Sequence, residues 1–198
     1  MADGPIERRR AAARAGHVGD VDGAIAALDD TDGRVRIAGL RSLARLEALG
    51  DDTLAGVLGD ADPTVRIAAL ETAARRDGPE IRHTLDDADP MVVETAAWAL
   101  GEREDLAAVE ALSVLATGHD DPLVREAAVA ALGAIGDEAG LPAILTATTD
   151  KPAVRRRAVL CLAPFDGPEV DAAFARARED RDRQVRDAVD ELLGPVDD

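Results

Sequence analysis

Residues 60–66 read Asp-Ala-Asp-Pro-Thr-Val-Arg, and related heptapeptides occur six times in the 198-residue chain. The sixth residue of each is a valine, and these valines recur every 27 to 32 residues. Apart from Arg157, the residues that follow each valine at offsets of three, four, seven and eight are small or apolar, and this is the spacing of one helix face. The pattern therefore predicts six helices, each with one buried stripe. The six valines are Val35, Val65, Val92, Val124, Val154 and Val185.

The repeat also predicts where each helix starts. The Asp before the valine can cap the helix, and the proline that follows it in four repeats sits where a first-turn residue needs no N–H group. Shorter amphipathic segments lie between these helices, so each unit is a helix, a turn, a second helix and an Asp-rich loop. The shorter segments are expected at 21–28, 52–58, 106–116, 141–147 and 169–177, after a leading helix at 6–15.

A unit of about thirty residues cannot bury its apolar face alone and must stack on its neighbours. The expected architecture is an all-α solenoid of six helical pairs, closed at its start by a capping helix over 1–18. We expect one domain over 1–198. Its repeats are placed at about 19–48, 49–76, 77–102, 103–135, 136–164 and 165–194.

The chain is strongly acidic: it has 40 acidic and 23 basic residues, and its formal charge is −17. The basic residues are 22 arginines and the single Lys151. This balance is typical of proteins from halophilic archaea, where molar salt screens the repulsion between carboxylates. An acidic protein from a GC-rich mesophile is the alternative. The N-terminus has no secretory pattern and no stretch is long enough to span a membrane, so we expect a cytoplasmic protein without membrane contact.

The recurring Asp-x-Asp-Pro-x-Val-Arg-x-x-Ala-x-x-Ala-Leu pattern over residues 19–194 resembles HEAT-like repeats, in particular the short repeats of the phycobilisome lyase type. The resemblance implies a right-handed α-α superhelix in which the Val-Arg helix lines the concave side. It also implies a ladder in which Asp and Arg side chains bridge neighbouring repeats. The acid five residues before each valine and the arginine after it supply candidates, with breaks at Val93, His119 and Thr149. The ladder candidates are Asp30, Asp60, Asp87 and Asp180 with Arg36, Arg66, Arg125, Arg155 and Arg186.

The candidate binding surface follows from the positions that point away from the buried stripe. Offsets two and six from each valine face outward, and one of them carries the only tryptophan, Trp98. Exposed aromatic residues with polar surroundings are typical of protein interfaces. The sequence therefore predicts a protein-binding surface centred on Trp98, although a small rotation would make this side chain a packing residue. The predicted partner-binding residues are Trp98, Ile67, Ile37, Arg41, Glu71, Glu94 and Leu160.

Other activities find less support in the sequence. Arginine clusters such as Arg8, Arg9, Arg10 and Arg14 could meet phosphates, but the overall charge and the interspersed acids favour solvated faces over nucleic-acid binding. The three histidines have no metal-ligand spacing, and the buried-looking Cys161 is a weak nucleophile candidate. We therefore expect no catalytic residue, cofactor or metal.

The predicted function is that of a monomeric scaffold or adaptor that binds an unidentified protein partner on its concave face. The alternative is a lyase-like enzyme or accessory factor that acts on a protein or prosthetic group held in the groove.

Overall fold

The computed structural model describes residues 4–194, and over this range all regular secondary structure is helical. The predicted all-α class is confirmed. The longer helices are α1 (Pro5–Val18), α3 (Gly33–Arg45), α5 (Pro63–Ala73), α6 (Pro90–Glu102), α8 (Pro122–Ile135), α10 (Pro152–Cys161), α11 (Pro168–Arg178) and α12 (Arg183–Leu193). The shorter ones are α2 (Val21–Ala26), α4 (Asp51–Leu58), α7 (Val109–Gly118) and α9 (Leu141–Ala147), with 3-10 turns η1 (Ala27–Asp29), η2 (Arg82–Asp86), η3 (Leu106–Ala108) and η4 (Glu138–Gly140).

The helices form pairs that follow the repeat pattern of the sequence. The second helix of each pair starts at the Val-Arg motif, and we call these six the Val-Arg helices: α3, α5, α6, α8, α10 and α12. The repeat over 77–102 is the exception in its first half, because only the five-residue turn η2 stands where the other repeats have a longer helix.

Aspartates cap the Val-Arg helices as predicted except at α10, where Lys151 is the N-cap residue and no side-chain hydrogen bond caps the helix. The carboxylate of Asp62 accepts a hydrogen bond from the backbone N–H of Thr64 at 2.9 Å, and Pro63 follows it at the first helical position. Asp32, Asp121 and Asp182 cap α3, α8 and α12 in the same way. Each cap satisfies an N–H group that the helix itself leaves without a partner.

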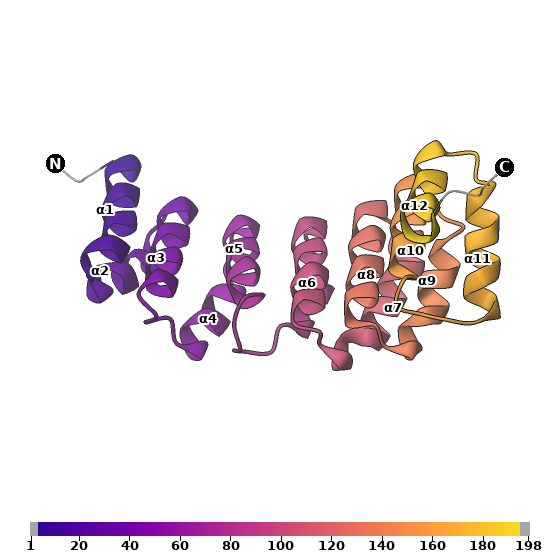
Figure 1. Ribbon diagram of the computed structural model, residues 1–198. Coiled ribbons are helices and arrows are strands. Elements are labelled where there is room, and N and C mark those ends of the chain that lie inside the picture. The colour runs from indigo at the N-terminus through magenta and orange to yellow at the C-terminus, as the bar shows by residue number, and fades with distance from the viewer. Residues whose placement is uncertain (1–3, 195–198) are drawn as a thin grey trace. The chain divides into compact units, whose positions relative to one another are not determined.

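The chain divides into two compact units, residues 1–92 and 93–198. In the first unit, α1, α3 and α5 lie side by side (Figure 1). Leu40, Leu54, Val65 and Leu70 are fully buried between the two helix rows of this unit. In the second unit α8 packs on α7 and α10, and α12 packs on α10. Its core contains Leu100, Leu112, Leu132, Ile144 and Leu162.

A ladder of ion pairs links successive repeats within each unit. The guanidinium of Arg36 donates two hydrogen bonds to the carboxylate of Asp60, at 2.7 and 2.6 Å, and a third to the backbone oxygen of Asp30 at 2.8 Å. Such bidentate pairs fix both geometry and charge. The same arrangement recurs in the other rungs, so the structural interpretation of these arginines agrees with the contacts. The remaining rungs are Arg8–Asp30 and Arg66–Asp87 in the first unit, and Arg125–Asp150 and Arg155–Asp180 in the second.

The ladder corrects the predicted break at Thr149. Asp150, one residue later, accepts the hydrogen bonds of Arg125 at 2.6 and 2.7 Å, since the chain there can present the neighbouring carboxylate to the same guanidinium. A rung that was not predicted comes from the leading helix, where Arg8 binds Asp30. The last predicted member, Arg186, donates to the backbone oxygen of Asp180 at 2.6 Å.

The other two predicted breaks correspond to real changes. Val93 occupies the position of the ladder arginine in α6, and its side chain is buried. At His119 the imidazole replaces the usual carboxylate, and its Nδ1 accepts a hydrogen bond from the backbone N–H of Asp121 at 3.1 Å. The loop before α8 is thus held as in the other repeats, but this position has no carboxylate for an arginine to bind.

Candidate functional site

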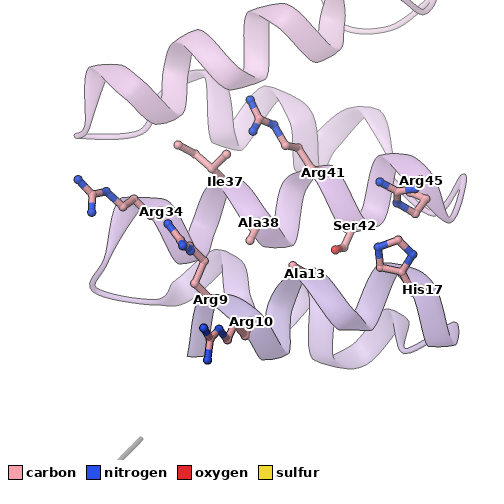
Figure 2. Close-up of a pocket in the computed structure, with 10 residues that line it drawn as sticks. All are labelled: Arg9, Arg10, Ala13, His17, Arg34, Ile37, Ala38, Arg41, Ser42 and Arg45. Carbon is pink, nitrogen blue, oxygen red and sulfur yellow. The ribbon is translucent and has the colours of Figure 1, made fainter. Parts of the chain in front are cut away.

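A groove runs between α1 and α3 on the exposed side of the first unit (Figure 2). Its volume is about 620 Å³. The walls are basic and the floor consists of small or apolar side chains, and we call it the basic groove. The lining residues are Arg9, Arg10, Ala13 and His17 of α1 with Arg34, Ile37, Ala38, Arg41, Ser42 and Arg45 of α3.

The close packing of α1 on α3 creates the floor of the basic groove. Gly16 lies against Ser42, where a Cβ atom on the glycine would come within 2.8 Å of the serine Oγ. The same Oγ donates a hydrogen bond to the backbone oxygen of Ala12 at 2.7 Å. Because the residues at this contact are small, the helix backbones approach closely, and the long arginine side chains rise on either side.

The charges of the basic groove have few partners in the protein. Over residues 4–194, Arg9, Arg10, Arg34 and Arg45 form no ion pair, whereas five ladder arginines, Arg8, Arg36, Arg66, Arg125 and Arg155, each pair with an aspartate. Arg41 pairs with Glu71 at 3.3 Å, but both side chains are largely exposed. No carboxylate lines the groove itself. The groove is therefore a site of positive charge in a strongly acidic protein.

The distribution of charge along the chain reinforces this contrast. Residues 1–50 contain eight arginines and eight acidic residues, so their formal charge is zero. Residues 51–198 therefore carry the entire formal charge of −17. Within residues 1–50, the acids at the repeat loop are used for the ladder and for capping, as in Asp30 and Asp32. The arginines of the basic groove are left for solvent or for a ligand.

A second groove, of about 920 Å³, lies between α3 and α5 and has mixed charge. Its lining combines Arg41, Arg45, Arg75 and Arg76 with Glu47 and Glu71. Arg76 is already engaged, since it donates to the backbone oxygen of Leu49 at 2.7 Å and to the carboxylate of Asp51 at 2.8 Å.

Three of the predicted partner-binding residues come together in the first unit. Ile37 and Arg41 line the basic groove, and Glu71 lines the adjacent groove and pairs with Arg41. Ile67 of α5 is half-buried and lines neither. Ile37 and Arg41, at offsets two and six from Val35, thus line one groove, and the role of all these residues in binding stays a prediction.

The other predicted residues belong to the second unit. Trp98 is 36% exposed on α6, Glu94 is half-buried on the same helix, and Leu160 is half-buried on α10. Trp98 is thus partly accessible. Whether it binds a partner is a prediction that these positions do not test.

Sequence reasoning did not assign Arg9, Arg10, His17, Arg34 and Arg45 to a binding surface. Arg34 and Arg45 lie at offsets −1 and +10 from Val35, which are one helical turn beyond offsets two and six on the same face. Extending the outward stripe by a turn in each direction would have found them. The arginines of the leading helix were recognised as a cluster, but the stacking of α1 on α3 was needed to show which of them face the groove.

Residues 4–194 show neither a metal site nor a membrane span. This part of the chain contains no group of three or more His, Cys, Asp or Glu side chains arranged to hold a metal ion. Nor does any helix in it have the length and hydropathy needed to cross a membrane.

The stacked helical pairs define an α-solenoid repeat protein. Sequence comparison is specific about the class of repeat: the family described as HEAT repeats matches residues 79–153 and 114–194, which together span more than half of the chain. The chain belongs to this family. No curated protein matches it in sequence.

Solved structures show the same fold at low sequence identity. YibA of Escherichia coli superposes with a TM-score of 0.65 at 18% identity, over 96% of this chain and 74% of that protein. Human deoxyhypusine hydroxylase, solved with glycerol, has a TM-score of 0.51 at 20% identity, over 97% and 80% of the two chains. A designed armadillo repeat protein in complex with the peptide (KR)4 has a TM-score of 0.50 at 16% identity, over 94% and 89%.

Proposed function

We propose that the protein is an interaction scaffold that binds a segment of a partner protein along the exposed face of its Val-Arg helices. The observation that carries this proposal is the basic groove, whose unpaired arginines and apolar floor offer both charge and contact area to a ligand. A fold of the same class, the designed armadillo repeat protein, is described in complex with a peptide. HEAT repeats encode stacking rather than chemistry, so the proposal rests on the groove and not on the family alone.

A site-specific photo-crosslinking experiment tests the scaffold function. A photoreactive amino acid is introduced at Ile37, which lines the basic groove, at Trp98, and at Ile25 of α2 as a control. Ile25 is 49% exposed but lies on the first helix of its pair, away from the Val-Arg face. We expect a discrete crosslinked protein from Ile37 in cells of the native host and none from Ile25. Trp98 tests the predicted binding surface of the second unit separately.

Two results would contradict the scaffold function. If no position yields a discrete product, the protein has no stable partner under those conditions. If Ile25 yields the same products as Ile37, the Val-Arg face is not the binding face. Trp98→Ala adds an independent check, since it should weaken partner capture at nearly unchanged stability if Trp98 is an anchor.

We propose that the scaffold is not an enzyme. The alternative is a lyase-like enzyme or accessory factor that acts on a protein or prosthetic group held in the groove. Visible absorbance and elemental analysis of the protein purified from its host distinguish the two. A stoichiometric chromophore or transition metal would favour the enzyme, whereas a colourless, metal-free protein that captures a partner favours the scaffold.

We further propose a monomer that works in the cytoplasm of a halophilic host, with repeats of the phycobilisome lyase type. The acidic composition supports the halophilic origin. Light scattering at the salt concentration of the host tests the monomer, and cell fractionation tests the location.

A further inference from the structure

We infer that the basic groove between α1 and α3 docks an acidic, extended peptide segment of the partner. This inference rests on the proposed scaffold function and adds the chemistry of the ligand. Its basis is the set of groove arginines that find no carboxylate in a chain with 40 acidic residues. A guanidinium group binds a carboxylate through two parallel hydrogen bonds, so each arginine offers a ready site for an acidic side chain.

The positive charges stand in two groups at the ends of the groove. Figure 2 shows Arg9, Arg10 and Arg34 gathered at one end and His17 and Arg45 at the other, with Arg41 on the wall between them. Arg34 and Arg45 are eleven residues apart on α3, which corresponds to roughly 16 Å along the helix. An extended chain rises about 3.3 Å per residue, so about five residues span the groove. A small anion can contact only one group, whereas an acidic peptide contacts both.

The floor of the groove favours a peptide with apolar side chains between its acids. Ala13 and Ala38 leave room above the helix backbones, and the half-buried Ile37 presents apolar surface to the space. Side chains of an extended peptide alternate in direction. A sequence that alternates acidic and small apolar residues can therefore place carboxylates toward one arginine wall while its backbone lies over the floor.

Two observations favour a peptide over a nucleic acid. No Phe, Tyr or Trp side chain lines the groove, although proteins that bind single strands commonly stack bases on such rings. The basic groove is also confined to α1 and α3, and residues 51–198 of the chain are strongly acidic. A phosphate backbone that continued past the groove would meet repulsion, whereas a five-residue acidic segment would not.

Peptide titrations test the inference directly. The full chain is titrated with a ten-residue peptide of alternating Glu and Ala, and with the same peptide carrying Gln for Glu, at the lowest salt concentration that keeps the protein folded. Isothermal titration calorimetry should give at least tenfold tighter binding for the Glu peptide. The double variant Arg9→Glu/Arg34→Glu should weaken that binding at least tenfold.

A matched control separates the groove from the net charge. The variant Arg181→Glu/Arg183→Glu makes the same change in charge at the start of α12, and it should bind the Glu peptide like the wild type. Circular dichroism melts verify that both variants are folded. Both Arg9 and Arg34 are exposed, and each lies near the first turns of a helix where an acidic residue is tolerated.

Several outcomes would overturn the inference. The Glu peptide could fail to bind, or the groove variant and the control variant could lose binding equally. A ten-nucleotide oligothymidylate could also bind as tightly as the Glu peptide or more tightly. Complete displacement of the peptide by millimolar phosphate would also count against it, because it would mean that single anions satisfy the groove. The scaffold function is judged separately: if Ile37 crosslinks a partner equally well with and without Arg9→Glu/Arg34→Glu, the scaffold stands and the acidic ligand is wrong.

Discussion

The guanidinium of Arg36 joins three chain segments, because it leaves α3, binds the carboxylate of Asp60 in the next repeat and binds the backbone of its own loop. Both side chains are mostly shielded from solvent, at 15% and 13% exposure. Asp60 also accepts the backbone N–H of Asp62 at 2.8 Å, so its carboxylate holds the loop before α5. Arg66 of the same repeat as Asp60 donates a hydrogen bond to the backbone oxygen of Asp60 and none to its carboxylate. The coupled side-chain pairs therefore run from one repeat to the next.

The first prediction concerns the coupling of Arg36 and Asp60. Each single alanine substitution leaves a partly buried charged group without its partner and should lower the free energy of unfolding by about 1–3 kcal/mol. The double variant should lose clearly less than the sum of the two losses. Urea denaturation of the four proteins measures this. Arg183 and Asp187, an exposed pair at 3.4 Å, should show no measurable coupling, and strict additivity at Arg36 and Asp60 would refute the ladder as a stabilising contact.

Cys161 gives a second prediction at the residue scale. Burial raises the pKa of its thiol to about 11, in spite of the nearby Arg157. The thiolate is the reactive form, so iodoacetamide at pH 8 should modify Cys161 very slowly in the folded protein and readily in 8 M urea. Mass spectrometry after timed quenching measures both rates. Comparable rates in the two states would mean that this end of α10 opens frequently.

At the scale of helices, close backbone approach governs how the pairs pack. A Cβ atom on Gly39 of α3 would lie 2.8 Å from the backbone oxygen of Ala24 and 2.9 Å from the Cβ atom of Ala27. Backbone atoms cannot move aside as a flexible side chain can. Gly56 of α4, by contrast, has no neighbouring atom within 4 Å of such a position.

The third prediction uses these two glycines as a matched pair. Gly39→Ala should destabilise the protein by about 1–3 kcal/mol because it forces α3 away from α2. Gly56→Ala should stabilise it by about 0.5–1 kcal/mol, since alanine is the better helix former and meets no obstacle. Thermal melts of the two variants give opposite shifts if the packing is as described. A stabilising Gly39→Ala would show that the two helices are farther apart.

Most helices could be predicted from sequence because each boundary has a local cause. Amphipathic segments bounded by Gly, Asp or Pro predict three of the shorter helical segments to within one or two residues. These segments are Val21–Ala26 with Ala27–Asp29, Asp51–Leu58 and Leu141–Ala147. The turn Arg82–Asp86 was not assigned, since five residues are too few to display a helical period. Asp150 was missed as a ladder acid for a different reason: a fixed offset cannot show which of two adjacent side chains reaches an arginine one repeat away.

The candidate site was less predictable than the fold. The offset rule found Ile37 and Arg41 because outward positions on one helix follow from its period. The basic groove, however, is formed by α1 and α3, which are separated in the sequence by fourteen residues of loop and short helix. Its charge also depends on which arginines already have an ion-pair partner. The run Arg8, Arg9 and Arg10 illustrates this, since Arg8 serves the ladder while its two neighbours line the groove.

At the scale of the whole molecule, the ladder carboxylates make stability depend on pH. Hydrogen bonds from arginine hold the pKa values of Asp30, Asp87, Asp150 and Asp180 below their ordinary range. The unfolded chain therefore binds protons at a higher pH than the folded one. The stability that these groups contribute is complete above the unfolded pKa values and is lost as the pH falls through the folded ones.

The fourth prediction is thus a loss of stability below about pH 4, measured by urea denaturation in molar salt between pH 7 and pH 2. Asp180→Asn should be less stable than the wild type at pH 7, because its paired charge is gone. Its stability should fall less between pH 5 and pH 2, because one titrating group is missing. Parallel pH curves for the two proteins would show that Asp180 does not contribute to the acid transition.

The last prediction concerns the balance of attraction and repulsion set by the charge of −17. The ladder pairs join charges at 2.6–2.7 Å in partly buried positions, so salt screens them weakly. The excess carboxylates repel one another over longer distances through solvent, where the Debye length falls from about 10 Å at 0.1 M salt to about 3 Å at 1 M. Salt should therefore remove more repulsion than attraction and stabilise the fold.

We expect the melting temperature to fall as potassium chloride is lowered from 2 M to 20 mM, by roughly 5–10 °C if the repulsion costs a few kcal/mol. Sucrose, which does not screen charge, should fail to replace the salt. Asn substitutions at Asp29, Asp77 and Asp86 remove exposed carboxylates that make no hydrogen bond within residues 4–194, and they should reduce the salt dependence. A melting temperature independent of salt would refute the halophilic origin. If sucrose raised the melting temperature as much as salt does, the stabilisation would come from exclusion of the solute from the protein surface and not from screening of charge. Only an ion shortens the range over which carboxylates repel one another.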